Sequence, residues 1–268
     1  LGQFRVQQIE VVTFNTANLP DQLFQGNSAD FEQMLSETVR FEEEGAPQEV
    51  STAEEAAQVA GFPVRLPTGL EGEQIITVQP GARVSFIVDL PRVRALLAEI
   101  GRADIQLPDN LDGAEVAIHL PTSVTAAYGA CSFSEADMQG AVESAPDLAS
   151  RSCHVLVQMP SPTIDAPPGL DIAAIGQAYL QVFGMPAEEA AKFSQRVDWA
   201  TTLVIPIPRY GTTYEDVDVD GVQGTLVLFG MDSHQPQYTL LWVKNGMVYA
   251  LSGPGKLADA LALAGTLK

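Results

Sequence analysis

Basic residues are scarce in this sequence of 268 residues. It holds 14 lysines and arginines against 34 aspartates and glutamates, which gives a formal net charge of −20. Nucleic-acid binding normally depends on clustered lysine and arginine, and the phosphates are repelled by a strongly acidic protein. The composition therefore predicts no nucleic-acid partner, and it disfavours an anionic membrane surface for the same reason.

Long apolar runs are also lacking. A membrane-spanning helix requires about 20 consecutive apolar residues, and the best run here, at 203–207, is short and contains Pro206. The chain begins at Leu1 without an initiator methionine, so we expect that a signal peptide or membrane anchor preceded it. Contact with a membrane is then expected only through that removed N-terminal anchor, with the chain itself outside the cytoplasm.

Cysteine is nearly absent, because Cys131 and Cys153 are the only two in the sequence. If they are paired, they close a loop of about 23 residues, which is worth roughly 3 kcal/mol in the chain-entropy treatment. We predict this disulfide, which indicates an oxidising compartment such as the cell surface or the medium. Two buried free thiols, or a reactive or metal-binding cysteine, are the alternatives.

The residues that usually carry catalysis show no recognisable spacing. The histidines His119, His154 and His234 occur singly, without the short spacing that places two ligands on one metal. Cys153 and His154 are adjacent on a predicted strand and therefore point to opposite faces. Ser252 does not lie in the strained turn that exposes a serine nucleophile. We expect no catalytic residue, no cofactor and no enzymatic activity.

One acidic segment resembles the start of a calcium-binding loop. Asp216, Asp218, Asp220 and Gly221 imitate the alternate oxygen ligands of such a loop, but its twelfth position, normally glutamate, is Val227. Asp-Gly between alternating residues also predicts a tight hairpin turn. We favour the hairpin and keep the three aspartates as candidates for a cation site.

Apolar periodicity predicts the secondary structure. Strands are expected at 4–14, 74–78, 83–89, 114–120, 153–159, 201–207, 224–229, 238–244 and 247–251. Helices are expected at 28–39, 51–60, 91–100, 172–183, 186–197 and 256–267. Residues 42–47 are interpreted as a solvated linker, and the Pro80-Gly81 and Asn245-Gly246 pairs as hairpin turns.

Several hairpins interleaved with helices, without regular strand–helix alternation, predict an α+β fold whose antiparallel sheets are built from hairpins with packed helices. We expect one extracytoplasmic unit over residues 1–268, with about 90–210 as a candidate central insertion.

Two segments resemble a known family. Residues 54–67, ending in Phe62-Pro63-Val64-Arg65-Leu66-Pro67, and residues 241–253, with Trp242 in a terminal hairpin, are similar to the uncharacterised extracytoplasmic C-terminal domain of membrane-anchored bacterial anti-sigma factors and related lipoproteins. The resemblance implies a sensory or interaction module attached through a membrane helix before Leu1. It transfers no catalytic residue.

The leading expectation is therefore a non-enzymatic extracytoplasmic module of a membrane-tethered regulator, which senses a small-molecule ligand or holds a protein partner. One alternative is a secreted or lipid-anchored protein that encloses an apolar ligand between its sheet and helices. The other is a hydrolase whose residues converge only in the fold.

Overall fold

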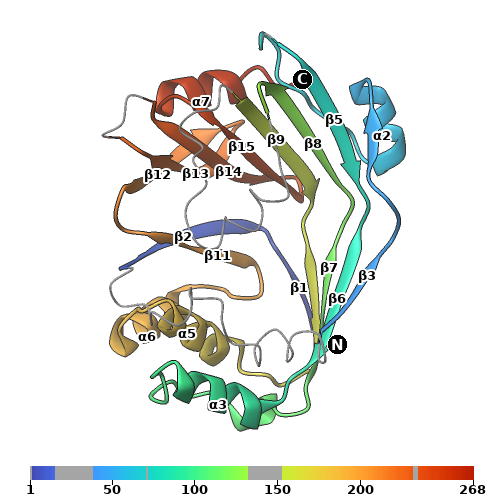
Figure 1. Ribbon diagram of the computed structural model, residues 1–268. Coiled ribbons are helices and arrows are strands. Elements are labelled where there is room, and N and C mark those ends of the chain that lie inside the picture. Colours follow the sequence, from blue (N-terminus) through green and yellow to red (C-terminus); the bar gives the residue numbers. More distant parts are fainter. Residues whose placement is uncertain (1, 16–38, 71, 132–152, 232–234) are drawn as a thin grey trace.

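A computed structural model gives the structure of residues 2–15, 39–70, 72–131, 153–231 and 235–268 (Figure 1). These residues form five α-helices and fifteen strands, and the sheets are antiparallel except for one two-stranded pair. The predicted α+β class is confirmed. Within the described ranges, every helix is too short or too polar to cross a membrane.

The largest sheet has eight strands in the order β12-β13-β14-β15-β9-β8-β5-β4. Its strands are β4 (Gln48–Val50), β5 (Gln74–Gln79), β8 (Ser123–Gly129), β9 (Cys153–Pro160), β12 (Thr212–Val219), β13 (Val222–Phe229), β14 (Gln237–Lys244) and β15 (Met247–Pro254).

A second sheet has five strands in the order β1-β10-β7-β6-β3. Its strands are β1 (Gly2–Arg5), β3 (Val39–Glu43), β6 (Ala82–Ile87), β7 (Glu115–Leu120) and β10 (Thr163–Ala166). The third sheet is the parallel pair of β2 (Gln8–Phe14) and β11 (Thr202–Pro208).

The two large sheets are joined by three long strands that bend from one sheet into the other. Gln79 on β5 lies opposite Ser123 on β8, and three residues further along both chains Ala82 on β6 lies opposite Leu120 on β7. The pairing of β8 with β9 likewise continues into the pairing of β7 with β10 without an extra or missing residue. The hairpin predicted at Pro80-Gly81 is therefore wrong: β5 and β6 are successive parts of one bent strand and do not pair with each other.

The unbroken register keeps alternate side chains on the same side of both sheets, because side chains in a strand alternate with a period of two. We call the outer face the side that carries Val78, Val124, Val84 and Ile118, and the inner face the opposite side. The strands on both sides of the bend share these two faces.

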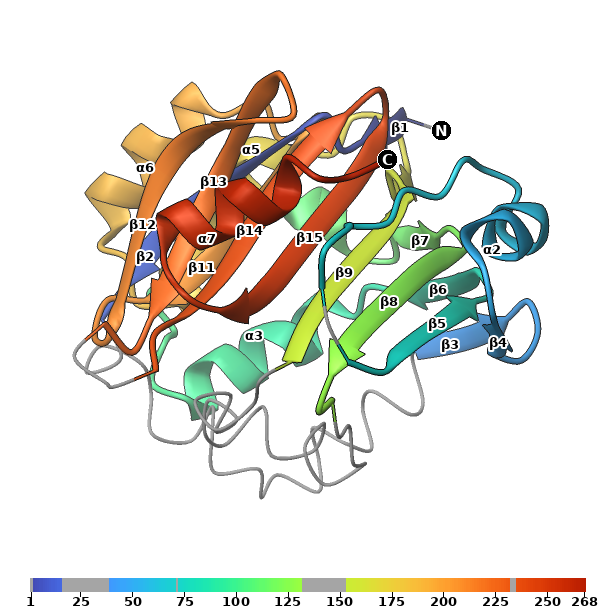
Figure 2. The same ribbon diagram turned by 90° about the horizontal axis from the view of Figure 1, so that it is seen from above.

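Two helices cover the outer face of the eight-stranded sheet (Figures 1 and 2). Helix α2 (Ala53–Ala60) packs on β5 and β8, and helix α7 (Leu257–Ala264) packs on β13, β14 and β15. The helix predicted at 51–60 is present as α2: the Thr52 hydroxyl accepts a hydrogen bond from the Glu55 amide at 3.1 Å, and Gly61 ends the helix at φ 78°.

The inner face of this sheet is covered in two layers. The β2–β11 pair packs against β13 through Val11 and Val227, and its other side contacts helices α5 (Ile172–Val182) and α6 (Ala187–Arg196). Helix α3 (Leu90–Glu99) packs on α5 through Leu97 and Ala178. A short 3-10 turn, Asp109–Leu111, precedes β7.

Two of the three predicted hairpin turns are present. Asp220 and Gly221 join β12 to β13, and Asn245 and Gly246 join β14 to β15; all four residues have positive φ, at 53°, 79°, 52° and 75°. Such turns require this backbone conformation, which Asn, Asp and Gly adopt most readily.

Several other predictions are wrong or lie outside the described residues. Most of the helix predicted at 28–39 lies outside them, but Val39 begins strand β3, and Glu42 and Glu43 belong to that strand and not to a linker. The predicted strand at 4–14 is divided into β1 and β2, which belong to different sheets. Strands β8 and β10 were not predicted at all. Strands β7, β8, β9 and β10 all lie within residues 90–210, the candidate central insertion. Each of them pairs with a strand that lies before or after this range.

Candidate functional site

The two cysteines form the predicted disulfide. Cys131 and Cys153 are bonded, with their Cα atoms 5.0 Å apart. The bond joins the segment after β8 to the first residue of β9, so it closes the chain across two neighbouring strands. The enclosed residues 132–152 lie outside the described ranges.

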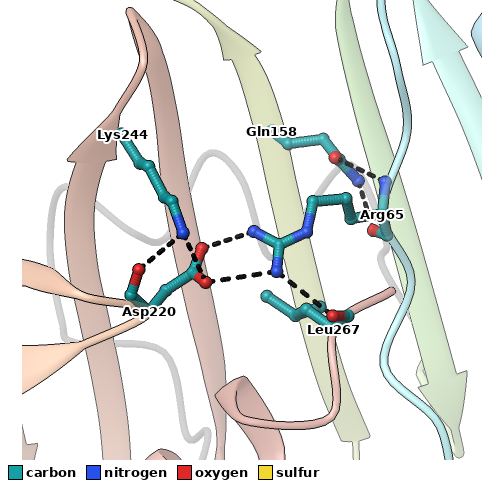
Figure 3. Close-up of polar contacts among 5 residues, drawn as sticks. All are labelled: Arg65, Gln158, Asp220, Lys244 and Leu267. Carbon is teal, nitrogen blue, oxygen red and sulfur yellow. Dashed lines mark hydrogen bonds and ion pairs between the residues drawn. The ribbon is translucent and has the colours of Figure 1, made fainter.

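The three aspartates of the candidate cation site do not converge. Asp216 and Asp218 lie on the exposed edge strand β12, whereas Asp220 lies in the turn after it and is bound by Arg65 and Lys244 (Figure 3). Within the residues that the structure describes, no three His, Cys, Asp or Glu side chains are grouped to hold a metal ion.

Asp220 is instead the centre of an ionic cluster, which we call the Arg65 clamp (Arg65, Asp220, Lys244, Gln158 and Leu267; Figure 3). The Arg65 guanidinium binds both carboxylate oxygens of Asp220, and its Nη2 also donates to the Leu267 carbonyl at 3.1 Å. Lys244 Nζ donates to Asp220 Oδ1 at 2.8 Å. The hydrogen bond from Arg65 lowers the pKa of Asp220 and, reciprocally, raises the pKa of Arg65.

The backbone of Arg65 is held as firmly as its side chain. The buried amide of Gln158 accepts from the Arg65 N–H at 3.0 Å and donates to the Arg65 carbonyl at 2.8 Å. The guanidinium also lies 6.0 Å from the ring of Tyr249, which stacks on Trp242 at 5.0 Å. The clamp thus brings together the two segments 54–67 and 241–253. Because its polar groups bind one another, we interpret it as a structural contact.

The outer face of the five-stranded sheet carries a different kind of feature. One apolar side chain from each strand lies in a single line across the sheet, since each residue is paired directly with the next. We call this line the apolar row. Its members, in spatial order, are Phe4, Ile164, Ile118, Val84 and Phe41.

The apolar row is open to solvent. Phe41 is 58% exposed and Ile164 is 37% exposed, while the other three side chains are half-buried. Leu120, on the same face one step nearer the bend, is 39% exposed. Contiguous exposed apolar side chains are uncommon on a protein surface and mark interaction sites.

A pocket of about 230 Å³ lies at the bend, on the same outer face as the row. Val59 of α2, Pro80, Thr122 and Glu44 are among the residues that line it. Glu44 extends over Gly81 on the inner side of the strand: a Cβ atom at this glycine would lie 2.6 Å from the Glu44 carboxylate. On the outer side, Val59, Val78 and Pro80 give the pocket an apolar wall.

The two described histidines lie on opposite faces of the bent sheet. His119, on the inner face of β7, has its Nε2 3.0 Å from Asp165 Oδ2. His154, on the outer face of β9, lies over Gly253, where a Cβ atom would be 2.4 Å from its ring. Burial lowers the pKa of His154 and thus favours the neutral ring. His234 lies outside the described residues.

The apolar row was not predicted from the sequence. The alternation of Val84 with Phe86, and of Val116, Ile118 and Leu120 along β7, is visible in the sequence as two apolar strand faces. Nothing in that alternation distinguishes a face that a helix covers from one that stays open. Compared with protein-family models, curated proteins and solved structures, the chain shows no significant match.

Proposed function

We propose that this protein is a non-enzymatic extracytoplasmic module that holds a protein partner on the apolar row. The observation that carries the proposal is the continuity of the row: five neighbouring strands each contribute an apolar side chain, and Phe41 at one end is 58% exposed. A surface of this kind is typical of a protein interface, whose core is apolar.

The charges around the row favour a partner with an apolar centre and a basic rim. Glu43, two residues after Phe41 on the edge strand β3, lies on the same outer face as the row. The pocket at the bend, lined by Val59, Val78 and Pro80, suits the aliphatic stem of an inserted lysine or arginine. A second copy of this chain is a poor occupant, because each copy carries a formal charge of −20.

The disulfide supports a location outside the cytoplasm, where such bonds persist. The likeness of segments 54–67 and 241–253 to the outer domain of anchored anti-sigma factors favours a membrane-tethered regulator. Reading the encoded residues upstream of Leu1 tests this part: we expect a run of about 20 apolar residues. A cleavable signal peptide alone would instead indicate a free secreted protein.

The docking surface is tested by photo-crosslinking in the native cells. A photoreactive phenylalanine analogue replaces Phe41 in one variant and Tyr210, which is 70% exposed away from the row, in the control variant. We expect a discrete adduct with a second protein from position 41 only. Adding Glu43→Gln should weaken the adduct, and Ile164→Ser should abolish it.

Three outcomes contradict the proposal: equal adducts from positions 41 and 210, no adduct from position 41, or an adduct with the mass of two copies of this chain. The last outcome would make the row a dimer interface, which sedimentation of the purified protein would show independently.

A further inference from the structure

The inner face of the five-stranded sheet gathers cationic side chains, although bases are scarce in the chain as a whole. Directly paired residues place Arg5, Thr163, His119, Arg83 and Glu42 in one line across the sheet. This line lies on the face opposite the apolar row. Arg40, two residues before Glu42 on β3, lies on the same inner face.

Arg83 is the most unusual member of this line. Its side chain is half-buried, yet it has no hydrogen bond or ion pair with any residue in the described part of the chain. Its neighbours on the two adjoining strands are His119 and Glu42, and even Glu42 makes no ion pair with it. Without an acceptor among the described residues, its guanidinium has its N–H donors available to a ligand.

His119 is oriented by its contact with Asp165, which lies 3.0 Å from the Nε2 atom. This contact engages Nε2 and leaves Nδ1 as the other polar atom of the ring. The side chain of His119 remains 38% exposed. Thr163, on the neighbouring strand, is paired directly with His119, so its side chain lies on the same face.

Arg5 is the residue of β1 in this line, and its guanidinium lies against the turn between β14 and β15. Its Nη2 lies 2.8 Å from the position that a Cβ atom of Gly246 would occupy, so the absence of a side chain at Gly246 makes room for this guanidinium. The Arg5 side chain is exposed, and it has no ion pair among the described residues. Arg5 and Arg83 therefore flank Thr163 and His119 on either side.

We infer that this inner face binds a small molecule through a carboxylate or phosphate group, seated over His119 and Thr163 between Arg83 and Arg5. Guanidinium groups are well suited to such anions, because they donate in a planar fork that matches both oxyanions. Three carboxylates lie near the site on this face. Asp165 is engaged by His119, Glu42 is the strand neighbour of Arg83, and Glu44 lies against Gly81. Among the described residues none of the three forms an ion pair with Arg5 or Arg83, so both guanidinium groups are left for the ligand. The site lies on the opposite face from the proposed docking surface and does not depend on it.

The test is a titration of the whole protein with inorganic phosphate and, separately, with succinate, each against chloride at equal ionic strength. Binding is followed by the NMR signal of the His119 ring. We expect a saturable shift with at least one anion, and the tighter of the two identifies the group that the site prefers. Arg83→Gln should weaken that binding at least about tenfold, because a charge-assisted hydrogen bond is lost.

Arg209→Gln is the matched control, since it removes the same charge from an exposed position in the segment between β11 and β12; it should leave the affinity unchanged. If Arg83→Gln does not fold, the exposed Arg5→Gln variant serves in its place and should weaken binding measurably. The inference is overturned if neither anion shifts the His119 signal beyond chloride, or if the arginine variants on the face bind as tightly as the Arg209→Gln control.

Discussion

The two ends of the outer face of the bent sheet differ in one respect, which is whether a helix covers them. In the eight-stranded sheet this face carries Leu156, Leu226 and Leu240, which are 0% exposed beneath and beside α7. Beyond the bend the same face carries the apolar row, in which Phe41 and Ile164 remain exposed. Both ends show the same alternation of apolar residues, so alternation alone does not decide burial.

The covered end of this face serves mainly the stability of the fold, and the open end serves mainly the binding of a partner. Burial of an apolar side chain stabilises the fold in proportion to the area removed from water, so most of this contribution comes from the covered end. The open end contributes little to stability and is available to a partner. Substitutions at the two ends should therefore affect different properties, and the predictions below compare them.

The largest effect is expected for Trp242→Ala at the covered end. The side chain is 1% exposed and stacks on Tyr249. Its removal leaves a large cavity, so we expect a loss of about 4 kcal/mol in the free energy of unfolding, measured by urea denaturation. Phe41→Ala at the open end is the matched aromatic control. Equal losses for the two variants would show that the row is buried in solution.

The second effect concerns the disulfide at the end of β8 and β9. Replacing both Cys131 and Cys153 by serine should lower the free energy of unfolding by about 3 kcal/mol, because the unfolded chain regains the freedom of the closed loop. The same loss should follow reduction of the native protein. A variant as stable as the native chain would show that packing alone holds these strands.

A smaller effect is expected for Asp220→Asn in the Arg65 clamp. Asparagine tolerates the positive φ of 53° at this position, so the substitution removes mainly the charge. We expect a loss of about 1–3 kcal/mol at pH 7, as for a hydrogen bond to a charged group.

The loss should depend on pH in a defined direction. Because the pKa of Asp220 is lowered in the folded protein, its contribution is present above the ordinary aspartate value of about 3.9 and is lost as the pH falls through the lower folded value. Unfolding curves of the two proteins should therefore converge on acidification. A difference that persists unchanged at low pH would assign the effect to packing instead of charge.

The smallest effect on stability is expected for the double variant Phe41→Lys with Ile164→Lys. Substitutions at exposed positions usually change the free energy of unfolding by less than about 0.5 kcal/mol each. Thermal unfolding of the purified protein should therefore be nearly unchanged, while the adduct formed in cells from a photoreactive analogue at Leu120, on the same face, should disappear. A large loss of stability would mean that the row packs against part of this chain.

Local patterns predicted many elements of this fold and missed others for a physical reason. The helix at 51–60 and the Asp220-Gly221 and Asn245-Gly246 turns depend on residues close together in the chain, and each is present as expected. Strand β8 was missed because its sequence, Ser-Val-Thr-Ala-Ala-Tyr-Gly, is rich in small residues. The pair Pro80-Gly81 predicted a hairpin turn, but in the structure these two residues lie at the bend of one long strand.

The candidate sites could not be predicted, because their residues are distant in the chain. In the apolar row, Val84, Ile118 and Ile164 are neighbours only because their strands pair with one another. The line that contains Arg83 depends on the same pairing, and an unpaired arginine is not recognisable before its surroundings are known.

The sequence by itself determined the α+β class, the tight hairpin turns and the partner cysteines, because these depend on composition and on residues a few positions apart. Only the tertiary structure decided which apolar face α2 and α7 cover, and which residues meet across the bend. Arg65 and Asp220 are 155 positions apart, and a contact at that separation follows from how the sheet is paired and folded, which no local pattern encodes.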